Sequence, residues 1–103
     1  MNVEWSDPAL DDLEGIQLYI AQDSPSYARQ FVERVFETTD RLADFPRLGR
    51  EVPEAQSPSV RELIFRGYRI IYRLAVPERA IILAVVHGRR DLTREELQPW
   101  NSD

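Results

Sequence analysis

The period of the hydrophobic positions changes along the chain, from alternation to helical spacing and back to alternation. Val3 and Trp5 alternate with polar residues, which predicts a short first strand. Apolar residues then recur every three or four positions in two runs, and these runs predict two helices. The first run carries Ala9, Leu13, Ile16 and Ile20, and the second carries Ala28, Phe31, Val32, Val35, Thr39 and Leu42.

Each predicted helix begins at a serine that is followed closely by a proline. Ser6-Asp7-Pro8 and Ser24-Pro25 both combine a capping hydroxyl with a ring that is tolerated in the first helical turn. The first helix is expected to end near Asp23 and the second before Pro46, so very few residues join them. This short connection predicts an antiparallel helical hairpin.

The second half of the chain predicts an antiparallel sheet. A loop with prolines at positions 46, 53 and 58 leads into three strands, near residues 60–65, 68–74 and 80–86. Turns at Arg66-Gly67 and Pro77-Glu78-Arg79 separate them, and the apolar last strand is typical of a central one. Thr93-Arg94-Glu95-Glu96 has the pattern of a capping box, which predicts a short C-terminal helix.

Together these elements predict a single α+β domain over residues 1–103. An N-terminal strand precedes the helical hairpin, which packs on one face of a small antiparallel sheet. The other face of the sheet is expected to be open to water or to a partner.

The alternation in the strands predicts which side chains share a face. A two-residue turn at Arg66-Gly67 pairs Phe65 with Tyr68, so Arg69 and Arg73 lie opposite the helices together with Glu62. The same register places Leu63, Phe65, Tyr68, Ile70, Tyr72 and Leu74 against the helices, with Arg61 near the edge of that side where its head can reach water.

The next turn decides where His87 lies. A three-residue loop at 77–79 pairs Val76 with Ala80 and sets Arg69 directly opposite His87, so that both side chains leave the open face together. A four-residue loop would shift the register by one and send His87 to the helix side, beside Tyr68. The three-residue loop is favoured because it directs Ile82, Ala84 and Val86 toward the helices.

The amino-acid composition limits the kinds of chemical site that the chain can form. The 103 residues include no cysteine and one histidine, so no disulfide, metal site or cofactor is expected. No apolar run is long enough to cross a membrane, and the N-terminus lacks the features of a signal peptide, so a cytoplasmic location without a membrane partner is expected.

Charge is unevenly distributed along the chain. The net charge is −5, which argues against nucleic-acid binding through the whole surface. Direct sequence-specific DNA binding by this chain alone is not expected. Between residues 61 and 90, however, seven arginines stand against two glutamates, and the chain contains no lysine. Arginine offers a rigid fork for carboxylate or phosphate, so this basic stretch is where a binding function is expected.

An ordered set of motifs over nearly the whole chain resembles the RelE/ParE superfamily of bacterial toxins from type II toxin–antitoxin pairs. The resemblance rests on Trp5-Ser6, Asp12-Leu13, Ile16, Tyr19-Ile20, Ser24-Pro25, Ala28, Phe31, Pro46, Gly49-Arg50, Val60-Arg61-Glu62-Leu63, Tyr68-Arg69-Ile70-Ile71-Tyr72-Arg73 and Val86-His87-Gly88-Arg89-Arg90-Asp91. It implies a helical hairpin on an antiparallel sheet, in agreement with the independent prediction above. It also implies a cognate antitoxin protein as partner.

The superfamily implies two different activities. RelE-like members cut messenger RNA on the ribosome without a metal, which requires a base, a cation for the phosphorane and an acid. Arg69 matches the transition-state arginine of YoeB-like members, His87 matches their general acid, and Glu51 matches their base only after a shift of one residue. These three are the catalytic candidates if the chain is a nuclease.

ParE-like members inhibit DNA gyrase and are not known to use nuclease chemistry. The Val-His-Gly-Arg-Arg-Asp ending and the Pro-x-x-Gly-Arg loop are more similar to ParE, and Gly88 stands where the nucleases have an aromatic residue. We therefore favour a ParE-like growth inhibitor over a ribosome-dependent endoribonuclease. A third alternative is an inactive module that only binds an antitoxin.

Candidate binding residues follow from these hypotheses. Those for the target are Arg50, Arg61, Arg69, Arg73, His87, Arg89 and Arg90, and those for the antitoxin are Leu10, Ile16, Phe31, Val35, Arg69 and Arg73, where they are not buried in the core. Structural roles are the alternatives: Arg69 and Arg73 bridging Glu62, Arg50 capping loop carbonyls, and His87-Gly88 ending a strand. For Trp100, packing on the body and a place in a frayed tail stay equally open.

Overall fold

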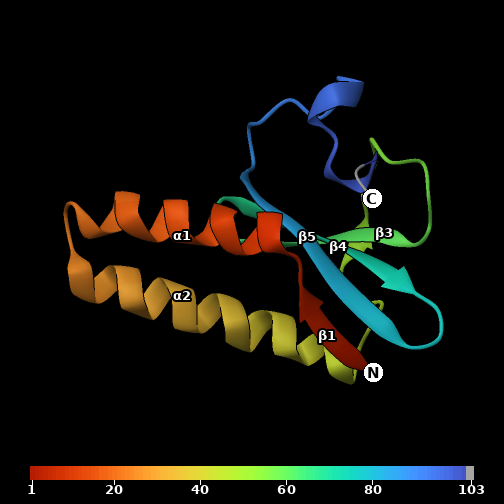
Figure 1. Cartoon of the computed structure of the whole chain (residues 1–103), viewed down its shortest axis with the longest axis horizontal. Coiled ribbons are helices and arrows are strands. Elements are labelled where there is room, and N and C mark those ends of the chain that lie inside the picture. Colours follow the sequence, from red (N-terminus) through yellow and green to blue (C-terminus); the bar gives the residue numbers. More distant parts are fainter. Residues whose placement is uncertain (102–103) are drawn as a thin grey trace.

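Two helices lie against one face of a five-stranded sheet in the computed structural model, which describes residues 1–101 (Figure 1). The elements are β1 (Asn2–Trp5), α1 (Asp7–Ala21), α2 (Pro25–Asp40), β2 (Arg50–Glu51), β3 (Val60–Phe65), β4 (Tyr68–Ala75) and β5 (Arg79–His87). Single turns of 3-10 helix follow α2 at Arg41–Ala43 and lie near the C-terminus at Glu95–Leu97 and Pro99–Asn101. The α+β fold class and the helical hairpin are confirmed.

The strand order is β1-β5-β4-β3-β2, and the sheet is mixed. β1 pairs with β5 in parallel, whereas the other neighbours are antiparallel. The antiparallel pairing predicted for the three strands of the second half is confirmed, and β1 adds a parallel strand beside β5. The loop after α2 also contributes the two-residue strand β2, which no alternation in the sequence marks.

Serine side chains cap both long helices as predicted. The Ser6 hydroxyl accepts a hydrogen bond from the Ala9 amide at 3.2 Å, and the Ser24 hydroxyl accepts one from the Tyr27 amide at 3.2 Å. Each satisfies an amide that has no partner within its own helix. Only Gln22, Asp23 and Ser24 separate α1 from α2, so the hairpin turns within three residues.

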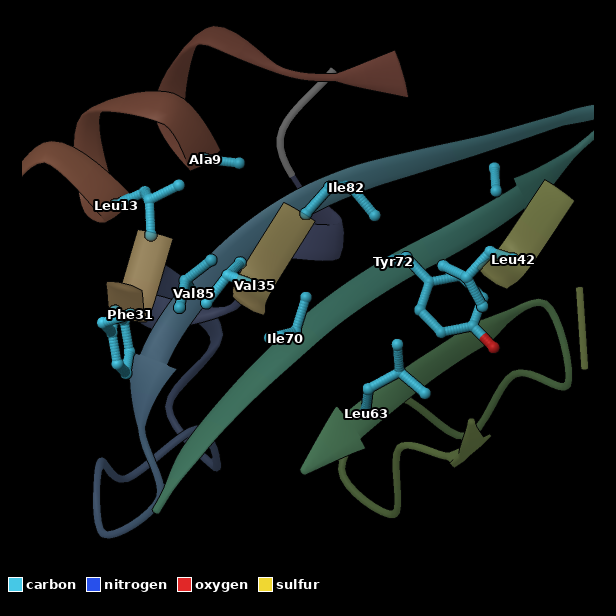
Figure 2. Packing of buried hydrophobic residues seen from close by; sticks show 11 residues of the cluster. Ala9, Leu13, Phe31, Val35, Leu42, Leu63, Ile70, Tyr72, Ile82 and Val85 are labelled. Carbon is cyan, nitrogen blue, oxygen red and sulfur yellow. The ribbon is translucent and has the colours of Figure 1, made fainter. Parts of the chain in front are cut away.

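The core on the helix side joins both helices to the three long strands. Figure 2 shows Phe31 and Val35 of α2 pointing toward Ile70 of β4 and Val85 of β5, with Leu13 of α1 above them. The cluster of buried residues is Ala9, Leu13, Phe31, Val35, Leu42, Leu63, Ile70, Tyr72, Ala80, Ile82 and Val85. The helical spacing of α2 therefore fixes which residues face the sheet.

The hairpin between β3 and β4 has the predicted register. Phe65 lies opposite Tyr68, and Ile64 lies opposite Arg69. Arg66 and Gly67 form the two-residue turn with φ values of 49° and 85°. Positive φ at both central residues is the geometry that matches the twist of the flanking strands.

The predicted register between β4 and β5 is wrong. Three residues do form the loop, but they begin one position earlier, because Ala75 pairs with Arg79. A bulge then places the extra residue Leu83 between Ile82 and Ala84, so that Tyr68 lies opposite His87.

The bulge reverses the sides of the following residues. Ile82 faces the helices as predicted, but Ala84 and Val86 pack on the opposite face, and Val85 joins the helix-side core. Since β5 is apolar throughout, both registers bury hydrophobic side chains, and alternation does not distinguish them.

The second face of the sheet is covered by the chain itself, which overturns the expectation of an open face. Val52 lies there with Ala55, and Leu92 and Trp100 of the C-terminal segment pack on the same cluster of buried residues from β3, β4 and β5. The Arg73 guanidinium donates a hydrogen bond to the Trp100 carbonyl, which holds this segment down. Trp100 thus packs on the body of the protein.

The C-terminal segment does not form the predicted capped helix. The amide and hydroxyl of Thr93 both donate to the Asp91 carboxylate, at 2.9 and 2.6 Å, so Thr93 is bound to its own loop. Two single 3-10 turns follow instead. Within residues 1–101, no helix is both long and apolar enough to cross a membrane.

Candidate functional site

Four charged side chains form a chain of ion pairs on the second face of the sheet; we call it the arginine–glutamate network. Arg69 on β4 is its centre. Its Nε donates to Glu62 at 2.6 Å, while its two Nη atoms donate to the carboxylate of Glu54 at 3.0 and 2.8 Å. The Nε of Arg50 donates to the other oxygen of Glu62 at 2.7 Å. The two arginines and two glutamates therefore balance in charge.

The network is most buried at its centre. The side chain of Glu62 is 0% exposed and that of Arg69 is 8% exposed, whereas Glu54 and Arg50 reach 22% and 62%. The Arg69 guanidinium holds the pKa of Glu54 below its usual value, and the Glu54 carboxylate, followed by that of Glu62, raises the pKa of Arg69. Arg69 makes a bidentate contact with Glu54 and a single close contact with Glu62. Its buried guanidinium is therefore a charged group held in a fixed position.

The backbone at Gly49, just before β2, lies very close to the backbone of Glu62 on β3 and keeps β2 beside this network. A Cβ atom at Gly49 would lie 2.5 Å from the Glu62 carbonyl oxygen, so only glycine fits there. The Gly49 amide donates to the Tyr72 hydroxyl at 3.0 Å, and that hydroxyl donates to the Pro46 carbonyl at 2.8 Å. The Arg61 side chain completes the clamp by donating to the Gly49 carbonyl at 2.8 Å.

A shallow hollow of about 370 Å³ opens beside the network. Its wall includes the charged residues Glu54, Arg69 and Arg50 and the apolar residue Ile64. Backbone at Gly67 and Gly88 forms its rim, where the Gly88 amide donates to the Gly67 carbonyl at 2.8 Å. The hollow therefore combines charged and apolar walls.

His87 lies on the other side of the sheet, at the end of β5. Its ring packs edge-on against Tyr68 with centroids 5.7 Å apart, and its Nδ1 accepts a hydrogen bond from the Arg89 amide at 3.1 Å. His87 borders a groove of about 410 Å³ between α1 and β5.

A carboxylate of α1 closes the edge of β5 inside that groove. β1 ends beside Ile82, and further along the Val85 amide donates to the Asp12 carboxylate at 3.0 Å. Burial raises the pKa of Asp12, against the opposing effects of this hydrogen bond and of Arg90. The unpaired edge is thus satisfied by a side chain, which protects it from pairing with another strand.

The three catalytic candidates do not converge. Arg69 and His87 lie on opposite faces of the sheet, so the prediction that they emerge side by side is wrong. Glu51 is exposed at the sheet edge, with its carboxylate 3.8 Å from Arg61. The bulge at Leu83 is the physical reason, since it turns His87 away from the side of Arg69.

The predicted target-binding arginines fall into two groups. Four of them bind groups of the chain itself. Arg50 binds Glu62, Arg61 binds the Gly49 carbonyl, Arg69 binds Glu54 and Glu62, and Arg73 binds the Trp100 carbonyl. Arg89, Arg90 and His87 are exposed at the end of β5. It is Arg61, and not Arg50, that binds a loop carbonyl, so the structural alternative stated for Arg50 is wrong.

Two of the predicted antitoxin-binding residues are core residues. Phe31 and Val35 are 2% and 0% exposed, because the face of α2 that carries them packs on the sheet. Leu10 is exposed on α1, and Ile16 is partly buried beside the groove. Leu18 and Tyr19 are also exposed on α1 but were not among the predicted antitoxin-binding residues. Both are large apolar residues between the core positions Ile16 and Ile20, and this pattern in the sequence could have indicated a second apolar surface on the helix.

Glu54 is the functional candidate that sequence reasoning missed. It lies in a loop, 15 positions before its partner Arg69, and no local pattern links the two. Among residues 1–101, no group of three histidine, aspartate or glutamate side chains could hold a metal ion.

Comparison with known proteins gives consistent relatives. Residues 3–92 match the family described as ParE toxin of type II toxin–antitoxin system, parDE. A curated relative in Sinorhizobium fredii, named "Putative toxin Y4kP", is 31% identical over 88 residues, which cover 85% of this chain and 88% of the relative.

Two solved structures share the fold. A chain of the chromosomal ParDE system from P. aeruginosa superposes with a TM-score of 0.69 at 23% identity, covering 84% of this chain and 95% of that one. A chain of the RelBE2 toxin–antitoxin complex from Mycobacterium tuberculosis has a TM-score of 0.53 at 22% identity, with the same coverage of 84% and 95%.

Proposed function

The chain belongs to the ParE toxin family of type II toxin–antitoxin systems, and we propose that it arrests bacterial growth by inhibiting DNA gyrase. The separation of the nuclease candidates carries the proposal. A metal-independent ribonuclease needs its base, its cation and its acid around one phosphate. Here the Arg69 guanidinium is occupied by two carboxylates, and the imidazole of His87 lies across the sheet.

The covered second face also supports inhibition over cleavage. RNA bound at Arg69 would have to reach a guanidinium whose two Nη atoms are held by Glu54. The neighbouring surface is occupied by Val52, Leu92 and Trp100, which pack against the strands. A nuclease site at Arg69 would first require this ion pair to open, and the packed residues leave little of the face free for an RNA strand.

The exposed end of β5 is the proposed contact with gyrase. The side chains of Arg89 and Arg90 are exposed there beside the exposed ring of His87. The hydrogen bond between Gly88 and Gly67 ties this segment to the β3–β4 turn, so the arginines start from a fixed backbone. Arginine, with tryptophan and tyrosine, is enriched among the residues that contribute most of the binding energy at protein interfaces.

A cognate antitoxin is the proposed inhibitor, and the two structural neighbours come from toxin–antitoxin systems. The helical hairpin carries exposed apolar side chains at Leu10, Leu18, Tyr19 and Tyr27. An amphipathic helix of the antitoxin can bury these side chains against its apolar face. We assign the contact to them in place of the core residues Phe31 and Val35.

Paired assays test the gyrase proposal. The purified chain should inhibit plasmid supercoiling by gyrase and should leave ribosome-bound messenger RNA intact. The double variant Arg89→Gln/Arg90→Gln should lose about tenfold in inhibitory potency, which corresponds to about 1.4 kcal/mol of binding. The matched control is Arg29→Gln/Arg41→Gln, which removes two exposed arginines from the α2 side of the molecule.

Three outcomes would overturn the proposal. Cleavage of messenger RNA in the ribosome assay would assign the chain to the nuclease activity. Normal growth on expression without an antitoxin would indicate the inactive antitoxin-binding module. Equal loss of gyrase inhibition in both double variants would remove the end of β5 as the contact.

A further inference from the structure

Glu54 reaches Arg69 from a loop, beside an unfilled hollow with one apolar wall. We propose that this hollow is a docking site for an acidic side chain of a protein partner, and that Glu54 occupies Arg69 as an internal substitute which the partner's carboxylate displaces. The proposal does not depend on the identity of the toxin's target. It concerns the second face of the sheet, and only the rim of the hollow at Gly88 adjoins the end of β5.

The geometry allows exchange on one side of Arg69 only. Glu62 holds the Nε atom from a fully buried position on β3, so this contact is shielded from solvent. Glu54 holds both Nη atoms and is the more exposed carboxylate of the two. A partner carboxylate that takes the place of Glu54 would find the same two parallel donors, so the exchange preserves the number of hydrogen bonds.

Anchors on either side of Glu54 limit the movement to a side chain and a short piece of loop. Val52 is buried and its amide donates to the Val60 carbonyl at 3.0 Å. Ala55 packs on the apolar cluster of the second face, and its amide donates to the Val52 carbonyl at 3.1 Å. Rotation of the Glu54 side chain therefore frees Arg69 without unfolding the sheet.

Charge favours one carboxylate as the ligand. With Glu54 in place, the arginine–glutamate network is neutral; without it, Arg50, Arg69 and Glu62 leave one positive charge. A single acidic side chain restores neutrality. A nucleic acid would bring many phosphates to a chain whose net charge is −5, so the protein ligand is the better match.

The apolar wall of the hollow favours a protein segment as well. Ile64 lies directly opposite Arg69 on β3, and its side chain is 59% exposed. β2 covers β3 only beside Arg61 and Glu62, so the edge of β3 from residue 63 to 65 has no strand next to it among the described elements. An extended segment with an acidic residue beside an apolar one fits both features.

Chemical rescue tests the site directly. Glu54→Ala removes the internal carboxylate, and propionate is the probe that should replace it. Urea unfolding of this variant in sodium propionate should show a folding equilibrium constant that rises roughly tenfold when propionate reaches about ten times its Kd, relative to sodium chloride at equal ionic strength. Glu51→Ala is the matched control, since Glu51 is an exposed glutamate of the same segment, and it should show no propionate-specific gain.

Two further comparisons define the ligand. Butyrate should rescue Glu54→Ala more strongly than acetate, and the difference should shrink in Glu54→Ala/Ile64→Ser, because the longer chain rests on Ile64. Dimethyl phosphate, which models a nucleic-acid backbone, should rescue less than propionate. A stronger effect of dimethyl phosphate would overturn the choice of a protein ligand.

A second measurement covers the case in which Glu54→Ala does not fold. Glu54→Gln keeps the shape of the side chain and removes its charge, and the Arg69 Nη–H signals in its NMR spectrum should shift on addition of propionate. In the unaltered protein the same signals should move much less, because Glu54 competes. Unmoved Arg69 signals in Glu54→Gln, or equal rescue of Glu54→Ala and Glu51→Ala, would refute the docking site.

Discussion

The two faces of the sheet are stabilised in different ways. The helix side is an apolar layer in which Phe31, Val35 and Leu42 of the α2 region meet Ile70 and its neighbours. The second face combines a smaller apolar cluster with the buried network around Arg69. Apolar packing loses stability in proportion to the volume removed, whereas a buried ion pair is sensitive to loss of either partner. The helix side is therefore expected to tolerate substitution better.

The largest expected effect is on the charged face. Arg69→Met should reduce the free energy of unfolding by about 4 kcal/mol, because the fully buried Glu62 loses its partner at Nε and Glu54 loses both of its donors. Urea denaturation followed by circular dichroism measures this loss. A loss below about 1 kcal/mol would mean that Arg50 alone compensates Glu62, and the contrast between the faces would disappear.

The next effect is on the helix side. Leu42→Ala should reduce the free energy of unfolding by about 3 kcal/mol, because the side chain is fully buried and leaves a cavity. Leu18→Ala is the control: the same atoms are removed from an exposed position on α1, and the change should stay within about 0.5 kcal/mol. Similar losses in the two variants would contradict the assignment of the core.

The smallest effect is in the pH dependence, and its sign differs between two carboxylates. The folded-state pKa of Glu54 is lowered from 4.5 by Arg69, so its contribution to stability is present above pH 4.5 and is lost as pH falls through the folded pKa. The folded-state pKa of Asp12 is raised from 3.8 by burial, so protonation of Asp12 as pH falls favours the folded state.

The free energy of unfolding, measured between pH 3 and pH 7, distinguishes the contribution of Glu54 from that of Asp12. Glu54→Gln should flatten the decrease of stability below pH 4.5, and Asp12→Asn should make that decrease steeper. Both variants keep the shape of the side chain, so the comparison isolates the charge. Parallel pH profiles for Glu54→Gln and the unaltered protein would contradict the strong pairing of Glu54 with Arg69.

Elements that depend on local patterns were predictable from the sequence. Ser6 and Ser24 mark the helix starts, and the Arg66-Gly67 turn sets the pairing of β3 with β4. Each follows from interactions among neighbouring residues. The bridge from Arg69 to Glu62 was also predictable, since cross-strand neighbours on one face follow from that register.

Elements that depend on distant contacts were not predictable. The parallel pairing of β1 with β5, the loop that brings Glu54 to Arg69 and the C-terminal cover with Trp100 all join residues far apart in the chain. The prediction of the position of His87 was wrong for another reason. One uniformly apolar strand accommodates two registers, and no local signal selects between them.

The bulge in β5 bears on how residues can be compared between relatives. Leu83 is one inserted position, and it reverses the orientation of every side chain from Ala84 to His87. Two homologues with the same histidine motif, one with this insertion and one without it, would present the imidazole to opposite sides of an otherwise superimposable strand. An identical residue in a sequence alignment at the end of this strand is thus evidence of shared ancestry. A shared role also requires the same strand geometry.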